Sequence, residues 1–358
     1  MKNKNLLVLF LLVSIFSYSQ KKSAKDSVGL HDFGDTYYKQ GINFMDSAEY
    51  KLAIKHFQMA LKENPVMFQA WNKIAYCKVQ QKDLKGAIKD LQKSLKIQPD
   101  NQGTLKYIGY VYLIEGKYDD AKKNLDSAFK IKNVDPELEY YCGWLKMIGK
   151  DYKGAIDNFT HAIQVKENYG LPYLKRGLIY SIQKNWKYTI RDITTGLQYS
   201  PADSSNIEVF RARAEANFEM GDYQGSVKDY SRIIVVDPKD ENAYTFRGRA
   251  RIEVNDNSGA IDDETKAIDL NKNSHIAYTF RGTAKNGLKQ YGKAIEDLDA
   301  AIKIKLDYAP AYVNRAAAKF SMGQKRKACD DLEKADKCGS ETAYLLIEKY
   351  CKNLEGSK

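Results

Sequence analysis

The side chains of this 358-residue chain that could support acid–base or metal chemistry are scattered along it. No two histidines have the spacing of a zinc-binding helix motif, and there is no nucleophile elbow, CxxC pair or phosphate-binding glycine loop. Asn255–Gly259 has the composition of a calcium loop but not its ligand spacing. The sequence therefore predicts no catalytic residue, no metal ligand and no cofactor. The four histidines are His31, His56, His161 and His275.

Arginine and aspartate recur together in the second half of the chain, at a constant offset of sixteen residues. Arginine can hold a carboxylate through two parallel hydrogen bonds, and a partly buried ion pair is tolerated only when both partners are present. We therefore predict five structural ion pairs. The alternative is a ladder of arginines that binds phosphate, nucleic acid or an acidic polymer, with its head groups turned away from the aspartates. The pairs are Arg176 with Asp192, Arg213 with Asp229, Arg247 with Asp263, Arg281 with Asp297, and Arg315 with Asp331.

The five cysteines divide into two groups. Cys77 and Cys142 are far apart in the chain and are interpreted as small core residues. If one helix covers residues 325–337 and an antiparallel helix covers 341–354, Cys329 and Cys351 lie at matching heights. A disulfide there would fix the end of the chain, and two reduced cysteines are the alternative. Cys338 is the expected free thiol.

The elements that position these residues belong to a repeat of thirty-four residues. Its clearest copies are Tyr50–Pro65, Leu84–Pro99, Tyr223–Pro238 and Tyr291–Leu306. About nine repeats follow, starting near residues 34, 68, 102, 136, 170, 207, 241, 275 and 309, with three extra residues in the Ser-rich stretch 202–206. A small residue marks the second half of each repeat at Ala53, Ala87, Ala121, Ala155, Thr189, Ser226, Ala260, Ala294 and Ala328.

Each repeat has apolar residues three and four positions apart in both halves, which predicts two helices. A large residue is common at place four and Gly or Ala at place eight, counted from the start of the repeat. Small residues allow two helix backbones to approach closely. The sequence therefore predicts an all-α solenoid over residues 34–342, followed by a capping helix and tail over 343–358.

This pattern resembles the tetratricopeptide repeat family. The resemblance implies a right-handed superhelix of antiparallel helix pairs, whose inner face is lined mostly by the first helix of each pair and usually binds peptides or protein segments. The chain lacks the lysine and asparagine set with which some members hold a C-terminal carboxylate. Thr189, Gly196 and Glu264 depart from the pattern, so the fifth and seventh repeats are expected to pack less tightly.

A column of aromatic residues marks the expected inner face of repeats two to four. Tyr76, Tyr110 and Trp144 all stand at place nine, and three more tyrosines lie near them in the sequence. Exposed aromatic rings with a polar edge suit an extended peptide or a sugar-like polymer. Burial of the rings between neighbouring helices is the alternative. The other candidate residues are Tyr107, Tyr140 and Tyr141.

The first nineteen residues predict a secretory signal. Lys2 and Lys4 precede the apolar run Leu6–Phe16, which is short for a membrane span and is followed by small residues. The alternatives are an uncleaved anchor and a chance apolar tail. We expect a polar tether over residues 20–33 and a chain exported to a periplasm or beyond, with no membrane span after cleavage.

Function is predicted from the repeat and from charge. The net charge of +11 comes from lysines interspersed with acids, which favours a solvated surface over nucleic-acid binding. The leading hypothesis is a non-enzymatic scaffold of the bacterial envelope that holds a protein or peptide partner in its concave face. The alternative is a cell-wall or glycan-associated accessory protein that binds an anionic or sugar polymer.

Overall fold

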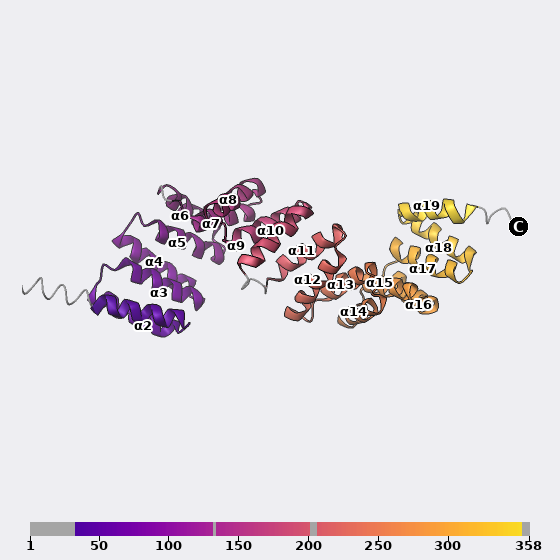
Figure 1. Ribbon diagram of the computed structural model, residues 1–358, viewed down its shortest axis with the longest axis horizontal. Helices are drawn as coiled ribbons and strands as arrows, with labels where there is room; N and C mark the ends of the chain where they lie inside the picture. The colour runs from indigo at the N-terminus through magenta and orange to yellow at the C-terminus, as the bar shows by residue number, and fades with distance from the viewer. Residues whose placement is uncertain (1–32, 132–133, 201–205, 353–358) are drawn as a thin grey trace, which may run out of the picture. The chain divides into compact units, whose positions relative to one another are not determined.

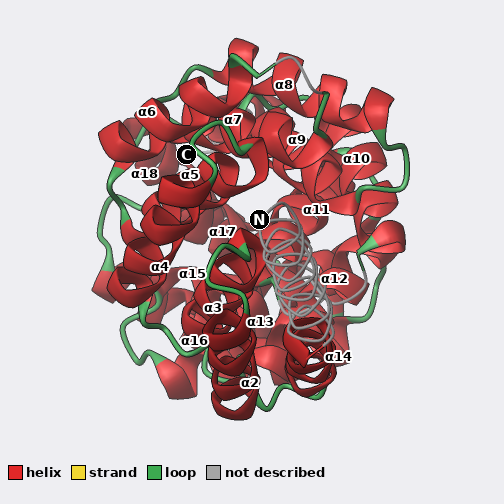
Figure 2. Ribbon diagram, turned by 90° about the vertical axis from the view of Figure 1, so that its left-hand side faces the viewer, coloured by secondary structure: helices red, strands yellow, loops and turns green. Residues whose placement is uncertain are grey.

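The computed structural model describes residues 33–131, 134–200 and 206–352. Within these ranges the ordered structure consists of helices joined by short turns, without a β-strand (Figure 2). The prediction of an all-α fold built from successive helix pairs is confirmed. Several features predicted from the sequence lie outside the described residues. They are the signal segment, the tether up to residue 32, His31, and residues 202–205 of the stretch that holds the three extra residues.

The helices of each repeat follow one another as antiparallel pairs (Figure 1). The first helices are residues 33–46, α3 (Phe68–Gln80), α5 (Gln102–Glu115), α7 (Pro136–Ile148), α9 (Gly170–Ile182), α11 (Ile207–Glu219), α13 (Glu241–Glu253), α15 (His275–Gly287) and α17 (Ala309–Ser321). The second helices are α2 (Tyr50–Glu63), α4 (Leu84–Ile97), α6 (Tyr118–Phe129), α8 (Tyr152–Val165), α10 (Trp186–Tyr199), α12 (Tyr223–Val236), α14 (Asn257–Leu270), α16 (Tyr291–Ile304) and α18 (Lys325–Lys337). A last helix, α19 (Glu341–Tyr350), follows.

The chain divides into two compact bodies, with the border between Glu167 and Asn168. The N-terminal body holds repeats one to four, and the C-terminal body holds repeats five to nine together with α19. Each body is described by itself below.

Aspartate fixes the start of several second helices. The Oδ1 atom of Asp83 accepts a hydrogen bond from the backbone N–H of Gly86 at 2.9 Å, and Asp222 does the same for Gly225 at 2.9 Å. Such a cap satisfies one of the backbone donors that a helix leaves free at its N-terminus. The residue directly before the cap often has positive φ, as at Gly221 with φ 82°. The turns inside the repeats are therefore encoded locally.

Close contact between the two helices of a repeat depends on the small residue at place eight. A Cβ atom added to Gly41 would lie 2.6 Å from the ring of Phe57, and one added to Gly143 would lie 2.7 Å from the ring of Phe159. Both phenylalanines are fully buried. Burial of a side chain of this size contributes about 1.5–3 kcal/mol. The glycine thus makes room for the largest core residue of its repeat.

The expectation of looser packing in the fifth repeat is wrong. Thr189 is fully buried, and its Oγ1 donates a hydrogen bond to the carbonyl of Asn185 at 3.0 Å. A Cβ atom on Gly196 would lie 2.5 Å from the Leu174 side chain and 3.0 Å from its backbone nitrogen. The missing methyl group therefore brings α9 and α10 together instead of leaving a gap.

Candidate functional site

A groove crosses the first helices of repeats one to three in the N-terminal body. Its central part has a volume of about 330 Å³. A second depression of about 360 Å³ shares Tyr38 and Gln69 with it, so the two adjoin at these residues and are together called the groove. The residues that line the central part are Tyr38, Gln69, Asn72, Lys73, Tyr76, Gly103, Lys106 and Tyr107.

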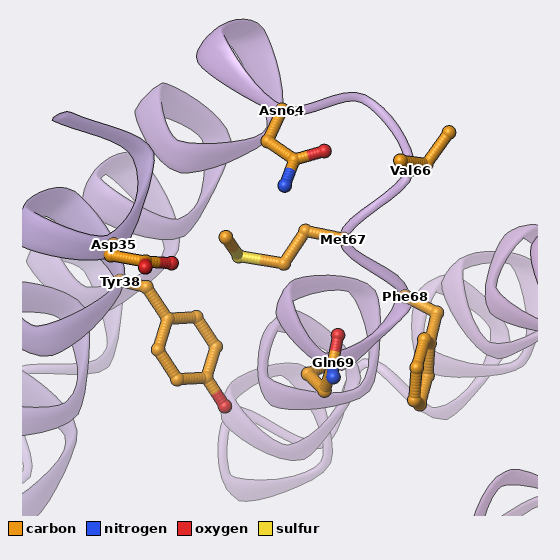
Figure 3. Close-up of a pocket in the computed structure, with 7 residues that line it drawn as sticks. All are labelled: Asp35, Tyr38, Asn64, Val66, Met67, Phe68 and Gln69. Atoms are coloured by element: carbon orange, nitrogen blue, oxygen red, sulfur yellow. The ribbon is translucent and has the colours of Figure 1, made fainter. Parts of the chain in front are cut away.

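The second depression lies where the chain enters α3 (Figure 3). The Met67 side chain points from this connection toward Asp35 and Tyr38 on the first helix, while Phe68 points to the other side of α3 (Figure 3). Met67 is almost fully buried, and the neighbouring Val66 is exposed. The end of the groove thus combines an adaptable apolar floor with the carboxylate of Asp35.

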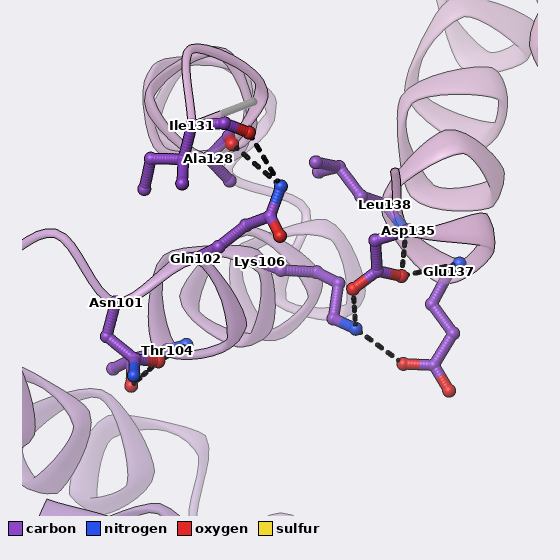
Figure 4. Close-up of polar contacts among 9 residues, drawn as sticks. All are labelled: Asn101, Gln102, Thr104, Lys106, Ala128, Ile131, Asp135, Glu137 and Leu138. Carbon is purple, nitrogen blue, oxygen red and sulfur yellow. Dashed lines mark hydrogen bonds and ion pairs between the residues drawn. The ribbon is translucent and has the colours of Figure 1, made fainter. Parts of the chain in front are cut away.

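Hydrogen bonds across repeats hold the polar wall of the groove. The side-chain amide of Asn72 donates to Thr104 Oγ1 at 2.9 Å, and Asn101 caps α5 by accepting from the Thr104 N–H at 2.8 Å. The amide of Gln102 donates to the carbonyls of Ala128 at 3.2 Å and of residue 131 at 3.0 Å (Figure 4). Side chains at the start of α5 therefore join the second repeat to the third and tie α5 to the end of α6 within the third.

Lys106 is fixed in one orientation at the groove edge. Its Nζ atom donates to Asp135 Oδ2 at 2.6 Å and to Glu137 Oε2 at 2.8 Å (Figure 4). Burial lowers the pKa of Lys106, but the hydrogen bonds to the two carboxylates outweigh this effect, so the pKa is raised. The Lys106 ammonium at the groove edge is therefore charged and held in place. Lys73, which also lines the groove, has no ion-pair partner among the described residues.

Ring contacts link five of the six predicted aromatic residues, all but Tyr76, and the six differ in exposure. Ring centroids are 5.6 Å apart for Tyr107 and Tyr110, 5.0 Å for Tyr110 and Tyr141, and 5.5 Å for Tyr140 and Tyr141. Tyr76 is 38% exposed, whereas Tyr140 is 5% exposed and packs on the core. Tyr107, Tyr110, Tyr141 and Trp144 are half-buried. Of the place-nine column, only Tyr76 stands free in the groove.

Burial also governs the tyrosine hydroxyls. It raises the pKa of Tyr107 and of Tyr141 far above the ordinary value, and it raises the pKa of Tyr110 and Tyr76 as well. The hydroxyl of Tyr107 is buried at the groove and has no hydrogen-bond partner among the described residues. These groups therefore stay protonated, and Tyr76, the most exposed of them, can donate a hydrogen bond to a bound carbonyl.

In the C-terminal body the five arginines all face their aspartates. Every pair has two hydrogen bonds, as for Arg213, whose Nε and Nη2 atoms donate to Asp229 at 2.7 Å each. The arginine side chains are 9–18% exposed and the aspartate side chains 0–7%. The other pairs are Arg176 with Asp192, Arg247 with Asp263, Arg281 with Asp297, and Arg315 with Asp331.

Four of these arginines also connect neighbouring repeats of the C-terminal body. The third nitrogen, Nη1, of Arg247 donates to Ser231 Oγ of the preceding repeat at 3.0 Å, and that of Arg281 donates to Thr265 Oγ1 at 3.2 Å. Arg213 makes the equivalent bond to Thr194, and Arg315 contacts Asp299. The partner always stands two residues after the aspartate of its own repeat. Each guanidinium thus has its donors directed at protein groups and not at a groove.

Basic residues at place eleven form a further set of contacts that the sequence interpretation missed. Lys78 reaches Asp90 at 2.5 Å, Lys285 reaches Asp297 at 2.7 Å and Lys319 reaches Asp331 at 2.6 Å. Lys146 donates to Asn158 at 2.7 Å in the fourth repeat. The signal was present in the sequence, since these residues stand four positions after place seven, one helical turn away.

Cys329 and Cys351 form a disulfide that ties α18 to the end of α19, with a Cα–Cα distance of 5.8 Å. Cys77 is fully buried, and burial raises its pKa to about 11. Cys142 is only half-buried, and burial followed by the charge of Glu139 raises its pKa to about 12. Cys338 is an exposed thiol. The disulfide therefore closes the C-terminal end of the core, which includes both of its cysteines.

The remaining candidates for chemistry stay apart. In the described part of the chain no three His, Cys, Asp or Glu side chains come together as metal ligands. Asp256 caps α14 by accepting from the Gly259 N–H at 3.0 Å, so the loop that resembles a calcium site starts a helix. His161 contacts Glu139 at 2.7 Å. Among the helices that the structure describes, none is both long and apolar enough to cross a membrane.

Comparison with known proteins supports the class that the helix pairs define, an α-solenoid repeat protein. Residues 38–102 and 276–308 each match a family model described as tetratricopeptide repeat. These two segments are therefore tetratricopeptide repeats, in agreement with the helix pairs of the fold. No curated protein matches the chain.

Several solved structures share similarity with the chain. The MamA protein has 23% identity and a TM-score of 0.42, covering 50% of this chain and 96% of its own. A tetratricopeptide repeat protein from Parabacteroides merdae has 17% identity and a TM-score of 0.41, covering 70% and 98%. The P58(IPK) TPR domain has 16% identity and a TM-score of 0.30, covering 91% and 99%.

Proposed function

We propose that this protein is a non-enzymatic scaffold of the bacterial envelope that holds an extended peptide segment of a partner protein in the groove over the 33–46 helix, α3 and α5. The observation that carries the proposal is that the two depressions share Tyr38 and Gln69 and so adjoin. Together they present hydroxyl, amide, ammonium and apolar groups on the first helices of three successive repeats. An extended chain, with its regular alternation of carbonyl, N–H and side chain, suits adjoining depressions of this mixed chemistry.

The chemistry of the wall suits a polypeptide backbone. The Lys73 ammonium lines the groove and lacks an ion-pair partner among the described residues. It can donate to backbone carbonyls, while Tyr76 and the Met67 floor offer apolar contact area for alternate side chains. Because the wall is held by cross-repeat hydrogen bonds, little order has to be gained on binding.

A sugar or anionic polymer is favoured less. Sugars stack on free ring faces, but the rings of Tyr107, Tyr110 and Tyr141 stack on one another. The arginine ladder that could have bound an anionic polymer is not available, because the five arginines of the C-terminal body are engaged by aspartates. The peptide is therefore the ligand that we propose.

Two features support the envelope as the location. The N-terminal sequence has basic residues, an apolar run and small residues in the order of a secretory signal. The disulfide between Cys329 and Cys351 fits an oxidising compartment, because disulfides persist in secreted and periplasmic proteins and are rare in the cytosol.

The test uses peptides selected from a random library on the chain that starts at Gln20. Dissociation constants are then measured for the native chain and for the variants Tyr76→Ala and Lys73→Ala. We expect each variant to weaken binding about tenfold, equivalent to about 1.4 kcal/mol. Tyr118→Ala is the matched control, because Tyr118 is an exposed tyrosine on α6, outside the groove.

Failure to select any peptide, or equal affinity for all variants, would contradict the proposal. Salt distinguishes the alternative: binding of an anionic polymer weakens steeply as ionic strength rises, whereas a peptide held by hydrogen bonds and apolar contact keeps most of its affinity.

A further inference from the structure

One repeat of the C-terminal body places a carboxyl group where its siblings place an apolar side chain. Place twenty-four of the seventh repeat is Glu264, on α14. It is 0% exposed, like the apolar residues at this place. The equivalent residues of the other repeats are Phe57, Leu91, Leu125, Phe159, Ile193, Tyr230, Leu298 and Leu332.

The carboxyl group of Glu264 is buried, and no hydrogen bond within the described part of the chain offsets the loss of its contacts with water. Neither oxygen of Glu264 has a hydrogen-bond partner among the described residues. The group lies against Gly248 of α13, where an added Cβ atom would come 2.3 Å from Oε1. The Thr245 hydroxyl is close enough to favour the charged form, but it forms no hydrogen bond of acceptable geometry and is itself buried and unpaired. An ionised carboxylate in such a place costs several kcal/mol.

The surrounding charges do not neutralise Glu264. On its own helix the neighbour is Asp263, whose carboxylate is held by Arg247 and Arg251 of α13. Glu241 adds a second negative charge from α13. The one cation contributed by α15 is Arg281, which is bound to Asp297 and Thr265. Burial first, and then the charge of Asp263, raise the pKa of Glu264 well above its ordinary value.

We propose that Glu264 is a proton-operated latch: the neutral carboxyl group lets α13, α14 and α15 pack together, and its ionisation opens the seventh repeat. A group whose pKa is raised by folding stabilises the folded form fully below its unfolded pKa. That stabilisation is lost as the pH rises through the folded pKa. The latch is therefore closed in acid and opens toward alkaline pH. It is independent of the peptide groove in the other body.

Hydrogen exchange of the full, oxidised chain from pH 5 to pH 10 tests the latch. After correction for intrinsic exchange, the opening constant of α14 should rise by up to about tenfold per pH unit between the ordinary pKa of a glutamate and the raised pKa of the folded form, because one proton is released on opening in that range, and should level off above it. The amides of α2 should show no such rise. The variants Glu264→Leu and Glu264→Gln should remove the pH dependence, whereas Asp262→Asn, at an exposed neighbour, should retain it.

Leucine is the native residue at this place in four other repeats, where Leu125 and Leu298 pack over glycines as Glu264 does. Glu264→Leu is therefore expected to fold, and Glu264→Gln keeps the shape of the carboxyl group. If α14 of the native chain opens with no pH dependence, or if Glu264→Gln keeps the native pH dependence, the latch is refuted.

Discussion

The two bodies of this protein are built from the same helix-pair repeat, but different side-chain contacts hold the helices together in each body. In the N-terminal body, places seven and twenty-three hold residues such as Ile108 and Asn124, and the first helices present a groove with Tyr76. In the C-terminal body the same places hold five bidentate Arg–Asp pairs, and four of the five arginines also contact the preceding repeat. The comparison shows that the period determines the helix pairs, while side chains at a few places decide what each region can do.

The ion pairs are better understood as specifying contacts than as a source of large net stability. Desolvation of two charges offsets most of their attraction, yet removal of one partner leaves a buried charge alone. An apolar residue and an amide at places seven and twenty-three, such as Ile108 and Asn124 in the third repeat, can therefore replace an ion pair.

The largest effect is expected from breaking one pair of the C-terminal body. Asp229→Ala leaves Arg213 buried without its carboxylate and should lower the opening free energy of α11 and α12 by about 3–5 kcal/mol. Hydrogen exchange of those helices measures this loss. The double variant Arg213→Ile with Asp229→Asn copies the third repeat and should recover most of the stability. Equal loss in the single and double variants would contradict the comparison.

The disulfide gives the next largest effect. Cys351→Ser removes a link between residues separated by twenty-two positions and should destabilise α19 relative to α18 by about 2–4 kcal/mol. Protection of the α19 amides should fall while protection in α3, in the other body, stays constant. Reduction of the native protein is the control and should give the same pattern. Unchanged protection of α19 would show that packing alone holds this end.

A smaller effect is expected in the N-terminal body at Gln102. Gln102→Ala removes the donor to two carbonyls at the end of α6 and should cost about 1–3 kcal/mol in the opening of α5 and α6. Gln92→Ala, at an exposed position on α4, is the matched control and should leave exchange unchanged. If both variants behave alike, these side-chain hydrogen bonds do not hold the wall of the groove.

The smallest effect concerns the links between repeats in the C-terminal body. Thr265→Ala removes the hydroxyl that accepts from Arg281 and should cost about 0.5–1 kcal/mol in the opening of α15, the range of a single hydrogen bond. Thr265→Ser keeps the hydroxyl and should behave as the native chain. A cost shared by both variants would point to the lost methyl contact instead of the hydrogen bond.

The fold followed from the sequence because the repeat occurs nine times, and each copy supports the others. The contact between Arg213 and Asp229 could be predicted as well, because residues separated by the same offset in every repeat lie at the same distance in every helix pair. Exposure of single aromatic residues did not follow. Tyr140 and Tyr141 are neighbours on α7, yet the first is buried and the second half-buried, because a small rotation of the helix decides which ring enters the core.

The groove was also only partly predictable. Place nine pointed to Tyr76, but most of the wall comes from places five and six, where Asn72, Lys73, Lys106 and Tyr107 stand. Those side chains differ from one repeat to the next, so periodicity does not single them out. Glu264 was visible as a departure from the pattern, but its lack of partners depends on where Arg281 directs its donors.

The most direct test of the account maps a selected peptide on the full chain by hydrogen exchange. The account predicts added protection in α3 and at the start of α5, around Tyr76 and Tyr107, with no change in α11 to α17. Protection confined to the helices of the C-terminal body, or spread evenly over both bodies, would contradict the assignment of the binding groove to the N-terminal body.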